Sequence, residues 1–444
     1  MEKLKILDIK DYTNGKLISE NENNTISNIS IDSRTVNEES LFVPIIGDVH
    51  DGHKFIDDVY QKGCKNFLCD KNHKTNINAN VVEVEDTTIA LGDIAKCYRN
   101  KFNIPFIGVT GSVGKTSTKD IIYSVLKVKY NALKNEGNLN NAIGVPRTLF
   151  NLENDTELAI IEMGMDKKGE LDYLSKIVRP EVAVITNIGQ SHIMNFPNGQ
   201  DGIFEAKMEI TNGLDGILIV NGDDKYLKQL KDKKNDFKLI TDGFNDYNDI
   251  YVKDYKINSE TSSFTCVYNG KEYSFEIKSI AKHNIANALI AIVIAFNYNL
   301  TEEEIEKGLL NIEFSQNRLD IFTTDKYRII NDTYNASYDS IMSATEILNS
   351  FNNRKVAILG DILELGKYSE EIHRKIGKNL KCDLLITIGN DSKYINEETN
   401  IQNYHFTSKE DFYKEANKLL KENDAILLKA SRAIGLDEVV EFLK

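Results

Sequence analysis

The sequence predicts an α/β protein of three domains, and three observations lead to this fold class. The chain has 444 residues, about three times the length of an ordinary domain. Short apolar stretches typical of strands alternate with longer stretches of helical periodicity. A Gly-Lys-Thr sequence at 114–116 lies between such a strand and such a helix, as in a phosphate loop. We expect domains at residues 1–85, 86–314 and 315–444.

Residues 1–85 are predicted to form a small α/β domain. An amphipathic stretch at 54–63, KFIDDVYQKG, is typical of a helix packed on one side of a sheet. The predicted strands are short, apolar and bounded by turn residues. They are ISNISIDSR (26–34), SLFVPIIG (40–47), KNFLCD (65–70) and VVEVED (81–86).

Residues 86–314 are predicted to form the largest domain, a parallel sheet covered by helices on both faces. It opens with a helical stretch at 88–102 and the strand PFIGVTG (105–111). The apolar run IANALIAIVIAF (285–296) is too short for a membrane span, which needs about 20 residues, and is expected to be a buried helix. Further strands are ELAIIEMG (157–164), VAVITNIG (182–189) and GILIVNGDD (216–224).

Residues 315–444 are predicted to form a Rossmann-like, doubly wound domain, because each apolar strand runs into a helix or loop. The predicted strands are YRIINDTY (327–334), KVAILGDILELG (355–366), DLLITIGN (383–390) and DAILLKASRAIG (424–435).

Composition limits the classes of partner. The formal net charge is −14, which opposes general binding to nucleic acid or to anionic lipid, so an anionic ligand needs a local pocket. The N-terminus has no apolar signal region, and we expect a cytoplasmic protein with no membrane insertion. The cysteines are odd in number, contain no Cys-x-x-Cys pair and are expected to be reduced. They are Cys64, Cys69, Cys97, Cys266 and Cys382.

The stretch IGVTGSVGKTSTKD (107–120) predicts a nucleotide site. At the end of a strand, its backbone N–H groups and the helix dipole would face phosphate oxygens. We expect Lys115 to reach the β and γ phosphates and Thr116 to bind Mg²⁺. The usual spacing would place a glycine at Val109, so the first glycine of this loop is displaced. The predicted phosphate-binding residues are Thr110, Gly111, Ser112, Val113, Gly114, Lys115, Thr116 and Ser117.

Four other features are weaker by themselves. Glu162 ends an apolar strand, where it is either an exposed charge or a second Mg²⁺ ligand. His192 and Lys207 have ordinary explanations as a satisfied histidine and a solvated lysine. Asn284 and Asn287 lie on one face of the apolar helix, and they would bond either an adenine edge or the backbone.

Taken in order along the chain, these stretches resemble the Mur ligase family, and within it the MurF type. The family's phosphate loop is Thr-Gly-x-x-Gly-Lys-[Ser/Thr], which accounts for the displaced glycine. The resemblance covers essentially the whole chain. Its other motifs are DSR (32–34), DGHKF (51–55), GNLNNAIGVP (137–146), EMG (162–164), TNIGQSH (186–192), AKMEI (206–210), HNIANAL (283–289), NDTYNASYDS (331–340), LGDILELG (359–366) and KASRAIGL (429–436).

The resemblance implies roles for individual residues. Glu162 would bind the same Mg²⁺ as Thr116, His192 would serve a second Mg²⁺, and Lys207 would be carbamylated by CO₂. Lys115, Lys207 and His192 would therefore be the catalytic residues. Asn284, Asn287, Arg318 and Asp332 would contact ATP, and Ser33, Arg34, Asp51, Gly52, His53 and Asn141 would contact the acceptor substrate.

The implied activity is an ATP-dependent peptide ligase of peptidoglycan precursor synthesis. It would join D-alanyl-D-alanine to UDP-N-acetylmuramoyl-tripeptide (UDP-MurNAc-tripeptide) through an acyl phosphate, with a UDP-binding first domain and a monomeric chain. The chain departs from the family pattern at Phe196-Pro197-Asn198, in a loop expected to contact substrate. It also departs at Ala430, where the family usually has glycine.

Three alternatives follow from the same residues. A related ligase, such as a folylpolyglutamate synthetase, would use another donor or acceptor. A nucleotide switch specific for guanine would need Asn-Lys-x-Asp after the loop, whereas Asn417-Lys418 is followed by two leucines. A catalytically silent scaffold would not need Lys115, Glu162, His192 and Lys207 together.

Overall fold

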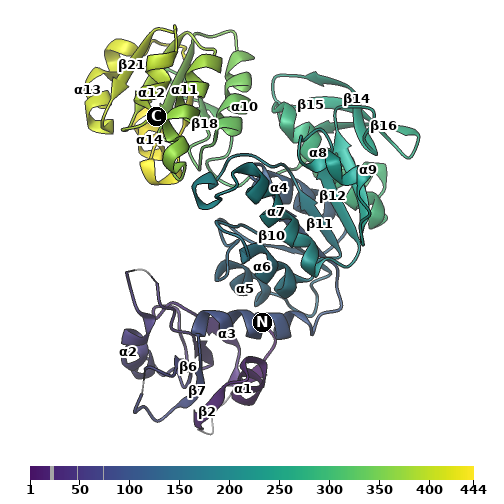
Figure 1. Ribbon diagram of the computed structural model, residues 1–444, viewed down its shortest axis with the longest axis vertical. Helices are drawn as coiled ribbons and strands as arrows, with labels where there is room; N and C mark the ends of the chain where they lie inside the picture. The colour runs from purple at the N-terminus through teal and green to yellow at the C-terminus, as the bar shows by residue number, and fades with distance from the viewer. Residues whose placement is uncertain (21–24, 48, 74) are drawn as a thin grey trace.

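The computed structural model describes residues 1–20, 25–47, 49–73 and 75–444, and these form three α/β bodies (Figure 1). The first body holds a five-stranded sheet, the second a nine-stranded sheet and the third a six-stranded sheet. This agrees with the predicted class of three α/β domains. The boundaries at 85/86 and 314/315 remain a prediction, although strands of the three main sheets begin and end within 16–84, 106–277 and 320–429.

The first body contains all four strands expected there. Its sheet has the order β2-β7-β6-β5-β4, in which only β2 runs antiparallel to its neighbour. The strands are β2 (Lys16–Ser19), β4 (Asn28–Ser30), β5 (Ser40–Phe42), β6 (Asn66–Asp70) and β7 (Asn80–Val84). A short ladder joins β1 (Leu4–Lys5) to β3 (Thr25–Ile26), and the helices are α1 (Ile6–Thr13) and α2 (Ile56–Gln61).

Helix α3 (Thr87–Arg99) connects the first body to the second (Figure 1). It begins at Asp86, whose carboxylate accepts hydrogen bonds from the backbone N–H groups of Thr88 and Ile89. Its buried Tyr98 donates a hydrogen bond to the carbonyl of Leu152 over 2.7 Å. Because α3 packs against α1 of the first body and against α5 and α6 of the second, the two bodies share one apolar core.

The central sheet has the order β16-β15-β14-β13-β12-β11-β8-β10-β9. Its strands from β9 to β14 are parallel, as predicted, but β15 and β16 add an antiparallel edge that was not predicted. Asn269 and Gly270, both at positive φ, form the two-residue turn between β15 and β16. The strands are β8 (Phe106–Thr110), β9 (Ala132–Lys134), β10 (Leu158–Glu162), β11 (Val182–Ile185), β12 (Ile217–Asn221), β13 (Lys238–Gly243), β14 (Ile250–Ile257), β15 (Ser262–Tyr268) and β16 (Lys271–Ile277).

Helices cover both faces of the central sheet. Alternate residues of β10 point to opposite faces, so Ala159 and Ile161 pack with one group of helices, whereas Leu158 and Ile160 pack with the other. The first group contains α5 (Gly144–Leu149), α6 (Glu170–Val178) and α7 (Gln200–Met208), and the second contains α4 (Lys115–Leu126), α8 (Lys282–Asn297) and α9 (Glu302–Leu310). The apolar run at 285–296 lies buried within α8. In the part of the chain that the structure describes, no helix is long and apolar enough to cross a membrane.

The third body is doubly wound, with the sheet order β17-β18-β22-β19-β20-β21. Only β17 is antiparallel to its neighbour. Helices α10 and α11 pack on one face, and α13 and α14 on the other. The elements are β17 (Asp320–Thr323), β18 (Arg328–Asn331), α10 (Tyr338–Asn349), β19 (Lys355–Gly360), α11 (Ser369–Asn379), β20 (Leu384–Ile388), α12 (Lys393–Glu398), β21 (Asn403–Phe406), α13 (Lys409–Leu419), β22 (Ala425–Lys429) and α14 (Asp437–Leu443).

Candidate functional site

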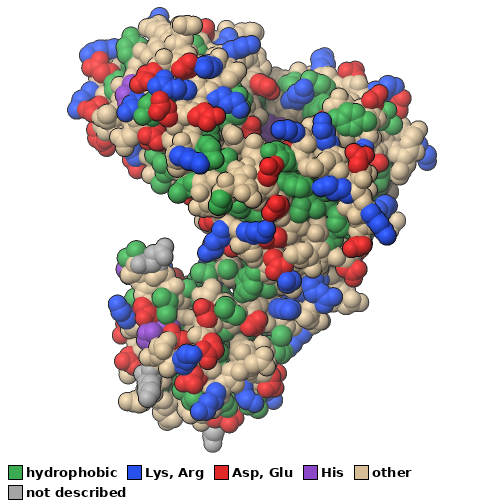
Figure 2. Space-filling view, viewed as in Figure 1, with side chains coloured by type: hydrophobic (Ala, Val, Ile, Leu, Met, Phe, Trp, Pro, Cys, Tyr) green, Lys and Arg blue, Asp and Glu red, His purple; other side chains and the backbone are tan. Residues whose placement is uncertain are grey.

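A cavity of about 1150 Å³ lies where the three bodies face one another, on the hollowed side of the molecule (Figure 2). The first body contributes Ile45, Ile46 and Gly47 to its wall, and the connecting helix α3 contributes Thr88. Of the residues predicted from sequence, those in the wall are Gly111, Ser112, Val113, Gly114, Lys115, Thr116, Ser117, Asn141, Glu162, His192, Lys207, Asn287, Arg318 and Asp332. The predicted residues outside the wall are Thr110, Asn284, Ser33, Arg34, Asp51, Gly52 and His53.

The loop between β8 and α4 has the geometry of a phosphate loop. Gly111 has φ 151°, and a Cβ added there would lie 1.9 Å from Oγ1 of Thr186. Gly114 has φ 80°, which a side chain would strain. The segment after β11 holds the loop, because Asn187 Oδ1 accepts a hydrogen bond from Val113 N–H over 3.0 Å. The loop leads into the N-terminus of α4, where backbone N–H groups and the helix dipole favour an anion.

Lys115 folds over this loop. Its Nζ donates hydrogen bonds to the carbonyls of Gly111 (2.8 Å) and Ser112 (3.3 Å). Burial lowers the pKa of Lys115 from its ordinary value, and nearby Glu162 acts in the opposite direction. The ammonium therefore lies beside the anion site with only neutral hydrogen-bond acceptors, and a phosphate oxygen would be a stronger acceptor than either carbonyl.

Glu162 is brought to the phosphate loop by the parallel pairing of β10 with β8, in which it lies opposite Val109. The Glu162 carboxylate accepts hydrogen bonds of 2.8 Å from Thr116 Oγ1 and from Asn140 Nδ2. Nζ of the buried Lys119 lies 3.7 Å from Glu162 Oε2. Lys119 and Asn140 were not predicted from sequence. The only local signal for Lys119 is its position one helical turn after Lys115, on the same face of α4.

His192 and Lys207 face the cavity from the loop after β11 and from α7. His192 Nδ1 lies 2.5 Å from Glu364 Oε2 and 3.3 Å from Asp166 Oδ1. Burial lowers the pKa of His192, while both carboxylates raise it. Lys207 is only 4% exposed, and its Nζ has no hydrogen-bond or ion-pair partner among the described residues. Burial lowers the pKa of Lys207 well below its ordinary value, which favours the neutral, nucleophilic amine.

The asparagine pair of α8 is divided between the cavity and the layer behind it. Asn287 lines the cavity, whereas Asn284 is buried, accepts a hydrogen bond from Asn287 Nδ2 (3.1 Å) and donates one to Ser279 Oγ (2.9 Å). The structure thus places Asn287 within reach of a ligand and places Asn284 where it orients the Asn287 amide.

The third body contributes Arg318, Asp332 and a lysine that was not predicted. The Arg318 guanidinium lies 4.0 Å from the centre of the Tyr334 ring. Lys429 ends the apolar strand β22, is buried, and donates a 2.5 Å hydrogen bond to Asp332 Oδ2. Burial lowers the pKa of Lys429, and Asp332 raises it. A lysine closing a buried strand was the available signal for Lys429 in the sequence.

Most of the predicted acceptor residues lie in the first body, away from the cavity wall. Arg34 forms a 2.7 Å ion pair with Asp32 and lowers the pKa of that carboxyl. Asn141 lies in the wall, and its Oδ1 accepts hydrogen bonds from the N–H groups of Ile143 (3.1 Å) and Gly144 (2.9 Å) at the start of α5. These bonds fix the turn that leads into α5.

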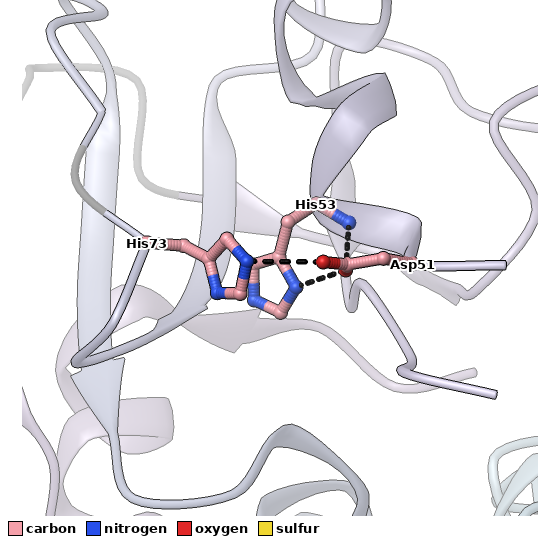
Figure 3. Close-up of side chains that lie close together, drawn as sticks. All are labelled: Asp51, His53 and His73. Atoms are coloured by element: carbon pink, nitrogen blue, oxygen red, sulfur yellow. Dashed lines mark hydrogen bonds and ion pairs between the residues drawn. The ribbon is translucent and has the colours of Figure 1, made fainter. Parts of the chain in front are cut away.

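Asp51, His53 and His73 form a compact cluster in the first body (Figure 3). The two imidazole rings stack 4.0 Å apart at 11°. Asp51 lies beside the stacked rings and contacts both, 2.8 Å from His53 Nδ1 and 3.0 Å from His73 Nε2, and Asp70 Oδ1 is 2.8 Å from His73 Nδ1. The lone pairs of the two rings lie in separate, nearly parallel planes, so these nitrogens do not point at one common ion. The cluster is a hydrogen-bonded clamp between the 51–53 and 70–73 turns.

Three family models match the chain in succession. They are "Mur ligase family, catalytic domain" at residues 25–99, "Mur ligase middle domain" at 109–295, and "Mur ligase, glutamate ligase domain" at 317–432.

Individual relatives match over the full length. A protein of Bacillus subtilis named UDP-N-acetylmuramoyl-tripeptide--D-alanyl-D-alanine ligase is 36% identical, covering 100% of this chain and 99% of its own. A protein of Escherichia coli with the same name is 30% identical over 98% of this chain and 97% of its own. A crystal structure of MurF from Acinetobacter baumannii superimposes with a TM-score of 0.94 at 27% identity, covering 100% and 99%. MurF ligase from Thermotoga maritima, in complex with ADP, has a TM-score of 0.84 at 26% identity, covering 93% and 96%.

Proposed function

The chain belongs to the Mur ligase family, and from this we propose that it is the ATP-dependent ligase that joins D-alanyl-D-alanine to UDP-MurNAc-tripeptide. One observation carries the proposal. Lys115, Thr116, Glu162, His192 and Lys207 come from separate segments of the chain and line one cavity to which all three bodies contribute. A reaction of three substrates needs such a common chamber. The family's D-alanyl-D-alanine ligases match this chain from end to end.

ATP is assigned to the side of the cavity formed by the phosphate loop. The N–H groups of the loop and Nζ of Lys115 bind the phosphates, and Asn287 and Arg318 lie where they can contact the rest of the nucleotide. The T. maritima relative was crystallised with ADP, which supports a nucleotide in this fold. An enclosed, water-poor position strengthens the attraction between Lys115 and phosphate.

The residues around Glu162 fit a divalent cation. A hydroxyl and a carboxylate, the groups of Thr116 and Glu162, already lie 2.8 Å apart at the edge of the anion site. Oxygen ligands of this type suit Mg²⁺. When bound, Mg²⁺ would neutralise phosphate charge and polarise the phosphoryl group. Two such ions, the second beside His192, are part of the proposal.

The cavity residues address the main obstacle of the reaction, which is repulsion between the substrate carboxylate and the triphosphate. Lys115 offsets part of that charge and holds the phosphoryl group in line. The carboxylate oxygen attacks the γ-phosphorus, ADP leaves, and an acyl phosphate forms. The dipeptide amine then attacks the acyl carbon and phosphate departs, while the amine gives up a proton. Because water would hydrolyse the acyl phosphate, closure of the three bodies is expected to exclude it.

Lys207 is proposed to be carbamylated. The modification needs a neutral amine. Burial without a counter-ion lowers the pKa of Lys207 and so favours the neutral form. The product is an anionic carbamate, which would bind a metal ion or pair with the ammonium of Lys115. The lowered pKa, the position in the cavity wall and the absence of a described partner support this assignment.

The first body is proposed to bind the UDP moiety through the DSR and DGHKF turns, and the clamp with His73 holds Asp51 and His53 of the second turn in place. The departures at Phe196-Pro197-Asn198 and Ala430 are not among the residues that line the cavity, and Phe196 and Ala430 are buried. A monomeric, cytoplasmic enzyme remains our expectation, and the cysteines carry no disulfide among the residues described.

One assay tests the proposal. Purified protein is given ATP with UDP-MurNAc-tripeptide ending in lysine or in diaminopimelate, with D-alanyl-D-alanine present or omitted, and phosphate release is followed. We expect release only when acceptor and dipeptide are both present, together with a product of matching mass. Turnover with glutamate and a folate acceptor instead would favour the folylpolyglutamate type. ATP hydrolysis in the absence of any acceptor and of the dipeptide would favour a switch protein.

A further inference from the structure

Helix α4 of the phosphate loop carries a buried polar stripe. Thr116, Asp120 and Ser124 are spaced four residues apart, so they lie on one face of the helix. All three are 2% exposed or less. Buried polar groups are retained where they have partners, and the partners of this stripe lead from the nucleotide site to the third body.

Two members of the stripe hold the chain that leaves the central body. Ser124 Oγ contacts the carbonyls of Gly308 and Asn311, both at 3.0 Å, at the end of α9. Asp120 Oδ2 accepts two hydrogen bonds from Ser315, one from its N–H (2.9 Å) and one from its hydroxyl (2.8 Å). Two bonds to one residue fix both its position and its orientation.

The other oxygen of Asp120 has a separate partner. Nζ of Lys134, on the edge strand β9, lies 2.7 Å from Asp120 Oδ1, and Nζ of Lys119 lies 3.8 Å from it. The ammonium groups offset the charge of the buried carboxylate, while Oδ2 is left for Ser315. The anchor at Ser315 and the charge compensation at Lys134 can therefore be disturbed independently.

Arg318 follows the anchor by three residues. The residues on either side of it, Asn317 and Leu319, have φ values of 59° and 51°, a left-handed conformation that is costly for leucine. Asn317 Oδ1 accepts a hydrogen bond from Asn331 Nδ2 over 3.0 Å, which ties it to the third body. The segment is thus fixed to the central body at Ser315 and to the third body from Asn317 onward.

We propose that Asp120 is a positioning residue, which anchors Ser315 and thereby sets the Arg318 side chain against the nucleotide. The inference rests on the proposed function, since it takes the nucleotide as the ligand of Arg318. It explains why a strained segment is held at both ends, and why the anchor lies on the same helix face as Thr116. A single helix, α4, then fixes the position of Arg318 of the third body relative to the phosphate site.

The test is ADP affinity of the full-length protein, measured by calorimetry without acceptor or dipeptide. Asp120→Asn and Ser315→Ala weaken hydrogen bonds at the anchor, and each is expected to weaken ADP binding, by about tenfold for Asp120→Asn. Lys134→Gln is the matched control, because it removes the partner of Oδ1 and leaves both Ser315 bonds. It is expected to change the ADP affinity by less than about twofold, because both bonds that anchor Ser315 remain.

A double-mutant cycle with Arg318→Ala decides whether the anchor acts through Arg318. In the Arg318→Ala background, Asp120→Asn is expected to cause no further loss of ADP affinity. Additive losses of ADP affinity in the double variant would overturn the proposal. It would also be overturned if Arg318→Ala weakened ADP binding while Asp120→Asn and Ser315→Ala both kept the native affinity. A loss in Lys134→Gln as large as that in Asp120→Asn would overturn it too. Should Asp120→Asn fail to fold, Ser315→Ala completes the same cycle. Absence of ligation with D-alanyl-D-alanine would contradict the proposed function, whereas the ADP affinities would still test the role of Asp120.

Discussion

The hydroxyl of Thr116 donates a 2.8 Å hydrogen bond to Oε2 of Glu162, although 46 residues separate the two along the chain. The contact exists because β8 and β10 are parallel neighbours, so that the helix after one strand meets the end of the other. Asn140 and Lys119 hold the same carboxylate. The ligands proposed for Mg²⁺ are thus already together in the protein, which lowers the cost of ordering them when the ion binds.

Glu162→Gln is expected to lower kcat by about 10²–10³-fold, the scale of losing one preorganised electrostatic contact. The Mg²⁺ concentration needed for half-maximal rate should rise, because an amide is a weaker ligand for the ion. Steady-state rates across a Mg²⁺ titration measure both effects. Glu205→Gln, an exposed change on α7, is the control. An unaltered Mg²⁺ requirement in Glu162→Gln would exclude Glu162 as a ligand.

Lys115→Ala is expected to abolish ATP-dependent ligation while leaving the fold intact. Among the described residues, the lysine bonds only carbonyls of its own loop, so its loss leaves no ion-pair partner without its charge. Phosphate release should fall by about 10³-fold or more, and the thermal midpoint should stay within a few degrees. Lys127→Ala, exposed just after α4, should keep full activity. Undiminished turnover in Lys115→Ala would remove the phosphate loop from the mechanism.

Lys207→Ala is expected to lower activity in a way that small carboxylates such as acetate partly restore. The reason is that the truncated side chain leaves room where the proposed carbamate would lie. Removing bicarbonate and CO₂ from the native enzyme should lower its rate as well, and adding them back should restore it. Lys176→Ala, an exposed change on α6 outside the cavity wall, serves as the control for both treatments. Carbamylation would be wrong if CO₂ depletion and Lys207→Ala both left the rate unaltered.

The His73 clamp predicts a pH-dependent stability. Hydrogen bonding to Asp70 raises the pKa of His73 above 6.5, so its stabilising effect is complete below that pH and is lost as the pH rises through the folded-state value. Asp51 and Asp70 have pKa values lowered from 3.8, so their contribution is lost only as the pH falls below that value. His73→Gln should therefore lower the thermal midpoint more at pH 5.5 than at pH 8.5.

His50→Gln, a change at an exposed histidine of the same body, controls for the general effect of removing an imidazole. A midpoint difference between His73→Gln and the native protein that is equal at both pH values would mean that the clamp does not titrate.

Local patterns were sufficient for much of this architecture. The strand ending at Thr110 and the helix beginning at Lys115 follow from apolar runs and glycines within a dozen residues, and both were found where expected. The antiparallel strands β15 and β16 were not predicted because they carry polar residues on an exposed face. The Asn269-Gly270 turn between them was the one sequence signal for this hairpin.

The site residues that were missed share a different cause. Lys119, Lys429 and Glu364 matter because of partners that other strands or bodies bring to them, at Glu162, Asp332 and His192. Such contacts depend on sheet order and on how the bodies pack, which periodicity does not encode. The resemblance to a family supplied the expected roles, but Asn284 shows its limit, since this residue lies behind Asn287 and outside the cavity wall.

Asp332→Asn is expected to destabilise the third body, because it leaves the ammonium of buried Lys429 without its carboxylate. Breaking one partner of a buried pair costs about 3–5 kcal/mol. Burial lowers the pKa of Lys429 below its ordinary value of 10.5, so the folded variant loses this proton at a lower pH than the unfolded chain does. Between those two pH values, the variant should become more stable as the pH rises. Thermal unfolding at pH 7.5 and 9.5 measures this, with exposed Asp325→Asn as control. The double variant Asp332→Asn/Lys429→Met should be more stable than Asp332→Asn alone, and a native midpoint in Asp332→Asn would show that the pair contributes nothing.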